Sequence, residues 1–155
     1  MKPRRSARVM VFDPAGRVLL IHCLVVRRDA KEFVFWLTPG GEIEPDEEPL
    51  AAARREVREE LGLELDVRGP VYTEQNQFEH MGEMRDNLDF YFVARCEAEA
   101  PRMQGVTTDE IAMMREIRWW TAEEVDSALA RGENVFPVDL ARRMKEFRGI
   151  GSADV

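Results

Sequence analysis

Runs of hydrophobic residues near the start of the chain predict three β-strands. Arg8 to Phe12 and Arg17 to Val26 are apolar and rich in β-branched side chains, and a turn sequence from Asp13 to Gly16 separates them. This sequence is typical of a hairpin, because proline fixes φ early in the turn and glycine closes it. A third apolar run, Phe33 to Leu37, leads into a turn at Pro39-Gly40-Gly41.

Helical patterns follow at three places. From Pro49 to Leu61 the chain has a proline in the first turn and a glycine just after the last, an arrangement that is common at helix ends. A second predicted helix begins at Thr121 and runs to about Arg131. Its Thr121 and Glu124 have the spacing of a capping box. The last predicted helix is Pro137 to Arg148.

Three more strands complete the pattern. They are Val71 to Phe78, Asp89 to Cys96 and Glu116 to Trp120, and the polar segment from Glu79 to Arg85 is predicted to be a loop. Helices and strands are thus mixed along the chain, and no repeat or linker appears between them. The pattern predicts one mixed α/β domain over residues 1–155.

Composition narrows the class of protein. The 155 residues are 45% hydrophobic and 34% charged, as in ordinary globular proteins. No apolar run approaches the roughly 20 residues needed to cross a membrane. The basic N-terminus is not followed by an apolar signal core. Cys23 and Cys96 lie far apart in predicted strands and are interpreted as buried thiols in a reducing compartment. We therefore expect a cytoplasmic protein that does not bind a membrane.

Negative charge is concentrated in one segment. The chain has a net charge of −8, and residues 41–63 contain eight acidic and three basic residues, a local charge of −5. The overall balance argues against non-specific binding to nucleic acid, which requires a basic face. It does not exclude small anionic substrates, because a bound metal ion can reverse the field of an acidic cluster.

Three glutamates converge on one face of the first predicted helix. With about 100° per residue, Glu56, Glu59 and Glu60 fall on an arc opposite a stripe of apolar residues. That stripe consists of Leu50, Val57 and Leu61. Like charges at these spacings repel each other and destabilise a helix. The arc is therefore either a solvated acidic face or a set of oxygen ligands of the kind that Mg²⁺ or Mn²⁺ prefers.

The spacing around these glutamates resembles a known signature. Counting from Gly41, five residues precede Glu47 and seven more precede Arg55-Glu56, after which Glu59-Glu60 and Gly62 follow. This is similar to the signature of the Nudix hydrolase family at every fixed position. The resemblance implies an α/β/α fold, in which helices sandwich a mixed β-sheet. One departure from the family pattern is Glu48, where Ser or Thr is frequent.

The resemblance also implies roles for individual residues. The family's metal ligands correspond to Glu56, Glu59, Glu60 and the backbone carbonyl of Gly40, with Mg²⁺ or Mn²⁺ as the cofactor. Arg55 corresponds to the arginine that orients the box glutamates, and we expect Glu47 to be one of its partners. The physical reason is that a planar guanidinium can bind a carboxylate at two points. A surface ion pair of small energy is the alternative.

The implied reaction is hydrolysis of a nucleoside diphosphate linked to another moiety. A metal ion neutralises the phosphate oxygens and lowers the pKa of a bound water, and a carboxylate accepts the proton of that water. This general base is either a box glutamate, such as Glu59 or Glu60, or an acid from a distant loop. Glu110 is the loop candidate, with Glu79 and Glu83 as competitors.

The substrate is not specified by the sequence. Nucleoside triphosphates, nucleotide sugars and damaged nucleotides all remain open, and the candidate substrate-binding residues are Arg27, Arg28 and Phe78. Phe35 and Trp36 could stack on a base, but packing in the core is a sufficient explanation for them. A catalytically inactive nucleotide-binding module is the alternative function, and a homodimer is compatible with the sequence.

Overall fold

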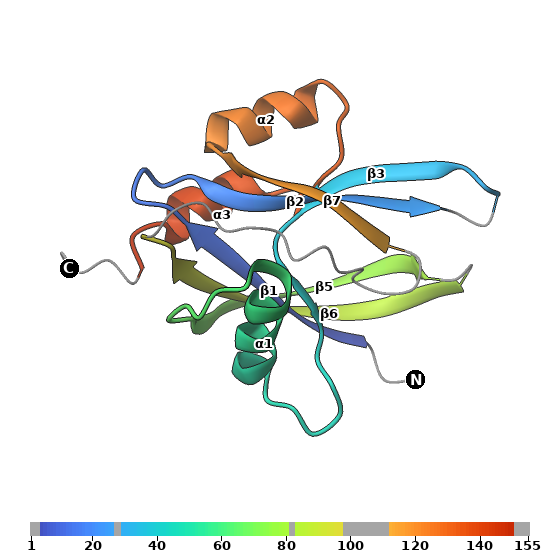
Figure 1. Cartoon of the computed structure of the whole chain (residues 1–155). Coiled ribbons are helices and arrows are strands. Elements are labelled where there is room, and N and C mark those ends of the chain that lie inside the picture. The colour runs from blue at the N-terminus through green and yellow to red at the C-terminus, as the bar shows by residue number, and fades with distance from the viewer. Residues whose placement is uncertain (1–3, 27–28, 81–82, 98–111, 151–155) are drawn as a thin grey trace.

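The computed structural model describes residues 4–26, 29–80, 83–97 and 112–150, with side chains described for all of these except 78–80 and 112–115 (Figure 1). Along the chain, the elements are β1 (Arg4–Phe12), β2 (Val18–Val26), β3 (Glu32–Leu37), β4 (Gly40–Glu42), α1 (Pro49–Leu61), β5 (Arg68–His80), β6 (Glu83–Arg95), β7 (Ala112–Trp120), α2 (Ala122–Ala130), β8 (Val135–Phe136) and α3 (Leu140–Phe147). Among the described residues, no helix is long and apolar enough to cross a membrane.

The strands form one mixed sheet of two parts. The order β5-β6-β1-β2-β3-β8 runs through the sheet, β4 pairs with β1, and β7 pairs with β2. β1 and β2 pair only at Phe12 and Val18, so the two parts diverge beyond the hairpin between them. In Figure 1, α1 lies below the strands and α2 lies above them. The predicted α/β architecture, a mixed sheet between helices, is confirmed.

Two hydrophobic cores cover the two faces of this sheet. One core packs α2 and α3 against the sheet; its largest fully buried side chains are those of Trp120, Phe12, Met10, Leu20, Leu140 and Met144. The other core packs α1 against the opposite face; its buried members include Ala7, Val9, Val11, Ala52, Ala53, Val57, Leu61 and Phe92. α1 is therefore held against β1 and β4.

Local interactions explain why the elements begin and end where they do. Asp13 Oδ1 accepts hydrogen bonds from the backbone N–H groups of Ala15 and Arg17, at 3.0 and 2.8 Å, which closes the β1–β2 turn. α1 ends at Gly62, which adopts the left-handed conformation with φ 68° that glycine accepts without strain. α2 begins with the predicted capping box between Thr121 and Glu124.

The predicted loop from Glu79 to Arg85 is wrong over most of its length. β5 continues to His80 and β6 begins at Glu83, and pairing extends to these two residues. The polar composition misled the prediction because residues 83–86 of β6 are all exposed, on both faces of the strand, and do not need an apolar side.

Two short strands were absent from the prediction, and one helix is shorter than predicted. β4 and β8 are three and two residues long, too short for a periodic pattern, and each is defined by its pairing with a distant strand. α3 begins at Leu140 rather than Pro137, because residues 137–139 form a turn in which Leu140 N–H bonds to Pro137 O at 3.1 Å.

Candidate active site

Glu60 lies beneath the turn that connects β3 and β4. Only 4% of the residue is exposed, and its Oε1 accepts a hydrogen bond of 2.7 Å from the backbone N–H of Gly40. The expectation that all three helix glutamates lie opposite the buried side is therefore wrong for Glu60, since β4 covers this part of α1 as well. Burial, together with the neighbouring Glu56, raises the pKa of Glu60 to about 8, although Arg8 opposes the shift.

Glu56 occupies the neighbouring position, above Gly41. Its side chain is 13% exposed, and burial raises the pKa of this carboxyl, an effect that Arg55 opposes. A Cβ atom at Gly41 would overlap the carboxylate of Glu56. A side chain at the second glycine of the turn would therefore displace the Glu56 carboxylate from this position.

Gly40, the first glycine of the turn, is required for a different reason. Its φ is +148°, and a Cβ atom here would overlap the carbonyl oxygen of Ala7 on β1. The turn can therefore lie directly against β1, where Gly40 pairs with Arg8. This packing holds the Gly40 N–H in place for Glu60.

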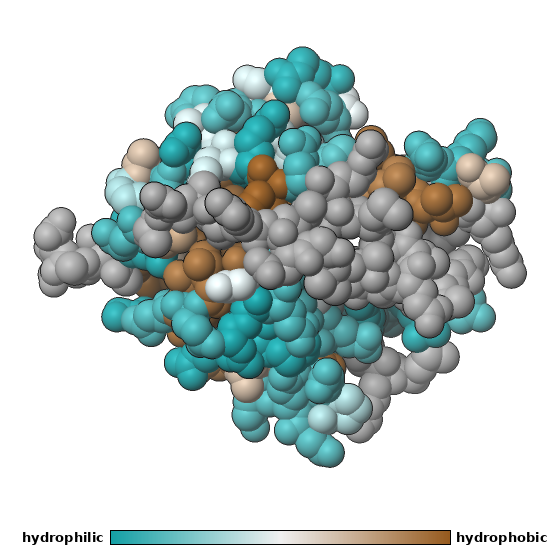
Figure 2. All heavy atoms as spheres, in the orientation of Figure 1, coloured by the Kyte–Doolittle hydropathy of each residue, from teal (hydrophilic) through white to brown (hydrophobic). Residues whose placement is uncertain are grey.

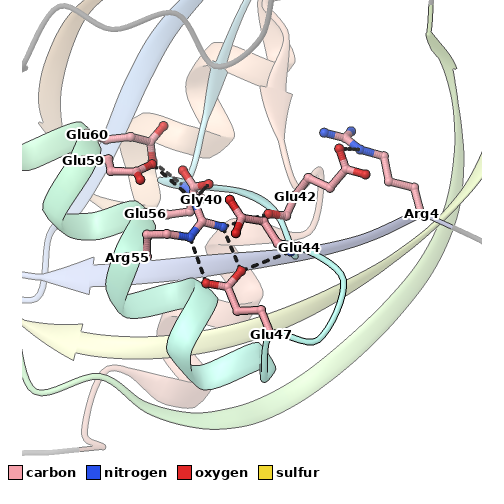
Figure 3. Close-up of polar contacts among 9 residues, drawn as sticks. All are labelled: Arg4, Gly40, Glu42, Glu44, Glu47, Arg55, Glu56, Glu59 and Glu60. Carbon is pink, nitrogen blue, oxygen red and sulfur yellow. Dashed lines mark hydrogen bonds and ion pairs between the residues drawn. The ribbon is translucent and has the colours of Figure 1, made fainter.

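Arg55 binds several acidic groups at once (Figure 3). Its Nε and Nη2 donate to the two oxygens of Glu47 at 2.8 and 2.9 Å, which is a bidentate contact. Its Nη1 donates to Glu56 at 2.9 Å and to Glu59 at 3.2 Å. The hydrogen bond to Arg55 lowers the pKa of Glu47 and raises that of Arg55. Arg55 thus fixes the direction of two helix glutamates while Glu47 fixes Arg55.

Glu59 completes the group but is more open to solvent. Its side chain is 53% exposed and forms an ion pair with Arg55. Among the described residues, no three acidic, histidine or cysteine side chains are already arranged around one point as metal ligands. Glu59 and Glu56 instead point toward Arg55, and Glu60 points toward Gly40.

The residues nevertheless fit a divalent cation in their chemistry. Glu56 and Glu60 are adjacent, largely buried carboxyls, and each is disfavoured in its charged form by burial and by other acids. Such a group of hard oxygen donors with an excess of negative charge is what Mg²⁺ and Mn²⁺ bind in proteins. A cation here would offset the charge that Arg55 and Arg8 leave uncompensated.

Arg8 is a site residue that the sequence analysis missed. It lies on β1 directly opposite Gly40, its Nη1 donates to Thr38 O at 3.4 Å, and its charge lowers the pKa of both Glu56 and Glu60. The available signal was the arginine at the start of the predicted apolar strand from Arg8 to Phe12. Its partner strand, β4, was not predicted, so the signal had no context.

The remaining candidates are not brought into this group. Glu110, Arg27 and Arg28 lie outside the described residues, as do the side chains of Phe78 and Glu79. Glu83 is exposed at the far end of the β5–β6 hairpin. The structure therefore assembles Gly40, Glu47, Arg55, Glu56, Glu59 and Glu60, and leaves the predicted substrate residues and the loop base untested.

The structure has a mixed sheet between helices, and a helix that carries the glutamates packs under a double-glycine turn. This combination defines the Nudix class of fold. The family model described as "NUDIX domain" matches residues 2–138. The chain belongs to the Nudix hydrolase family.

Curated relatives carry several different names. The chain is 44% identical over 62 residues to an RNA pyrophosphohydrolase of Bartonella henselae, a match that covers 39% of this chain and 36% of that protein. It is 27% identical over 128 residues to diphosphoinositol polyphosphate phosphohydrolase 3-beta of Homo sapiens, with 76% and 73% covered. The first of these matches spans about a third of the relative's length. The substrate named for that relative is therefore not assigned to this chain.

Solved structures agree on the fold. The solution structure of the E. coli ORF135 protein superposes with a TM-score of 0.64 at 24% identity, over 99% of this chain and 96% of that chain. A Nudix-family hydrolase from Clostridium perfringens superposes with a TM-score of 0.66 at 17% identity, over 98% and 100%. At these identities the likeness establishes the fold alone.

Proposed function

We propose that the protein hydrolyses the pyrophosphate bond of a nucleoside diphosphate linked to another moiety, with Mg²⁺ or Mn²⁺ as cofactor. The observation that carries this proposal is the group formed by Glu56, Glu59 and Glu60 under the Gly40-Gly41 turn, oriented by Arg55 and Glu47. Acids held this close together, at a cost in helix stability, are explained by a cation that binds between them.

The side chains of Glu56, Glu59 and Glu60, with the carbonyl of Gly40, would hold the metal. When bound, the metal supplies charge neutralisation at phosphate oxygens and a water of lowered pKa. Arg55 keeps Glu56 and Glu59 oriented through its hydrogen bonds, and Gly41 leaves room for the Glu56 carboxylate. The proton of the attacking water passes to a carboxylate, which is either Glu59 or Glu60 or, from outside the described residues, Glu110.

Aromatic residues on β3 and β8 support a nucleotide as the substrate. Phe33 stacks on Phe35 at 5.4 Å between ring centroids, and Phe136 meets Phe35 edge-on at 5.9 Å. Phe35 packs on a small cluster around Ile21 and Cys23 that contains no helix residue, and Figure 2 shows hydrophobic surface at this end of the molecule. Flat apolar rings suit the face of a nucleobase.

The cytoplasm is the proposed location. Cys23 and Cys96 are both buried and neither forms a disulfide bond, which suits a reducing compartment. The proposed substrates, nucleotides with a diphosphate linkage, are consistent with that location.

A substrate panel with product identification tests the proposed function. Purified protein with Mg²⁺ would be given nucleoside triphosphates, nucleotide sugars, oxidised nucleotides, diphosphoinositol polyphosphate and 5′-triphosphate RNA, and the phosphorus products would be identified by ³¹P NMR. Turnover of a nucleotide with cleavage between two phosphates is the expected result. Tight binding of a nucleotide without turnover would contradict hydrolysis and favour a binding module.

A further inference from the structure

Arg5 lies on the same face of the sheet as the glutamate group. Its strand neighbours Ala7 and Val9 both pack in the core beneath α1. Because side chains alternate along a strand, Arg5 points to this α1 side as well. Ala7 pairs with Gly41, over which the carboxylate of Glu56 lies. Arg5 is two residues from Ala7, which corresponds to about 7 Å along the strand.

Arg5 differs from the other arginines of this region in its contacts with the described residues. Arg55 is held by three carboxylates, and Arg8 donates to Thr38 O. Arg4 pairs with Glu42 at 3.3 Å. For Arg5, the part of the chain that the structure describes provides no hydrogen-bond or ion-pair partner to the guanidinium, and the residue is partly exposed.

The neighbours of Arg5 do not account for its charge. Ile43, whose N–H bonds to Arg5 O at 2.9 Å, lies on one side, and Leu88 pairs with Arg5 on the other. A guanidinium retained between two apolar residues has five N–H donors available and a planar shape that matches phosphate oxygens. The segment on its α1 side is otherwise strongly acidic, so an anionic ligand near Glu56 needs such a cation.

We propose that Arg5 binds a phosphate group of the substrate next to the diphosphate that the glutamate-bound metal holds, and that it thereby favours nucleoside triphosphates over nucleotide sugars. This inference rests on the proposed function. A triphosphate has a third phosphate next to the diphosphate, whereas a nucleotide sugar has an uncharged sugar at that position. The contact contributes to substrate binding and does not take part in bond cleavage.

The test compares Arg5→Gln with Arg4→Gln, a matched control on the same strand. Arg4→Gln removes the same charge one residue away, on the opposite face, where Arg4 reaches toward Glu42 (Figure 3). Binding of an α,β-methylene nucleoside triphosphate with Mg²⁺ is measured by calorimetry, which does not depend on turnover. KM and kcat are then measured for a nucleoside triphosphate and for a nucleotide sugar.

We expect Arg5→Gln to raise the dissociation constant of the analogue and the KM for the triphosphate by about 10-fold or more, the size of a charge-assisted hydrogen bond. The kcat and the KM for the nucleotide sugar should stay within about 3-fold of wild type, and Arg5→Lys should restore part of the affinity because it keeps the charge. Arg4→Gln should resemble the wild type.

Two results would overturn the inference. If Arg5→Gln binds the analogue as Arg4→Gln does, Arg5 does not contact the substrate. If it loses affinity for triphosphate and nucleotide sugar equally, Arg5 does not select a third phosphate. A wild-type protein that binds the analogue through Arg5 but hydrolyses nothing would contradict the proposed function and leave the Arg5 contact supported.

Discussion

At the scale of single residues, the site is governed by carboxyls that the fold buries against their preference for water. Glu60 is the extreme case, since one hydrogen bond from Gly40 and the distant charge of Arg8 do not offset its desolvation, and its pKa rises to about 8. In metal-free protein, Glu60 therefore retains a proton that the unfolded chain releases above its ordinary pKa of 4.5. The folded protein therefore binds more protons than the unfolded chain between pH 4.5 and about 8.

This linkage gives the first prediction. The contribution of Glu60 to stability should be fully present below pH 4.5 and should be lost as pH rises through about 8. In excess EDTA, Glu60→Gln should therefore become more stable relative to wild type between pH 5 and pH 9, as measured by thermal unfolding in steps of pH. Glu59→Gln serves as the control, because a side chain that is 53% exposed should leave the slope close to that of wild type. Parallel pH profiles for wild type and Glu60→Gln would contradict a raised pKa of Glu60 in the folded protein.

Gly41 carries a second prediction at this scale. In Gly41→Ala the new methyl group overlaps the Glu56 carboxylate, so the carboxylate must move away from the turn. We expect the affinity for Mn²⁺ to fall by about 10-fold or more, as when a partner that orients a metal ligand is lost. Gly149→Ala is the control, because nothing lies within 4 Å of a Cβ atom there. Equal Mn²⁺ affinity in the two variants, measured by calorimetry, would show that Glu56 does not need this position.

At the scale of elements, the two longer helices begin in different ways. α2 has a complete capping box, with Glu124 N–H bonded to Thr121 Oγ1 at 3.1 Å and Thr121 N–H bonded to Glu124 Oε1 at 2.8 Å. α1 has Glu48 at the same position in an extended conformation, and its side chain caps no N–H group. The helix that carries the site thus starts without the side-chain acceptor that most helices use.

This difference predicts that Glu48→Ser stabilises the protein. Serine at an extended N-cap position can accept a hydrogen bond from the second or third N–H of the helix, which is worth about 1 kcal/mol. The free energy of unfolding, measured by urea denaturation, should rise by about this amount while kcat is unchanged. Glu48→Ala removes the same charge without adding a cap and should not reproduce the gain. If serine and alanine have the same effect, charge rather than capping determines the stability of this end.

At the scale of the whole molecule, what could be predicted depended on how local its cause was. The hairpin at residues 13–16, α1 with its terminal Gly62, and the capping box of α2 follow from neighbouring residues, and each is present in the structure. The acidic group on α1 was visible for the same reason. The second and third glutamates lie three and four residues after the first, so the geometry of a single helix places them on one face.

Features that depend on contacts between distant segments were missed. The burial of Glu60 requires β4, and β4 exists through its pairing with β1, more than thirty residues earlier in the chain. The role of Arg8 depends on the same pairing. The polar end of the β5–β6 hairpin is held by pairing as far as His80 and Glu83, which no apolar pattern reveals. Sequence reasoning thus identified the acidic side chains that the fold brings together and missed the contacts that surround them.

The central claim is that the glutamates of α1 hold a divalent metal that hydrolysis requires. The most direct measurement is kcat on the best nucleotide substrate, with Mg²⁺ and with excess EDTA, for the wild type and Glu60→Gln. We predict that EDTA abolishes turnover, that added Mg²⁺ restores it, and that Glu60→Gln lowers kcat at saturating Mg²⁺ by at least about 100-fold, or about 2.7 kcal/mol of transition-state stabilisation. Undiminished turnover in excess EDTA, or a Glu60→Gln protein with the wild-type kcat, would contradict the account.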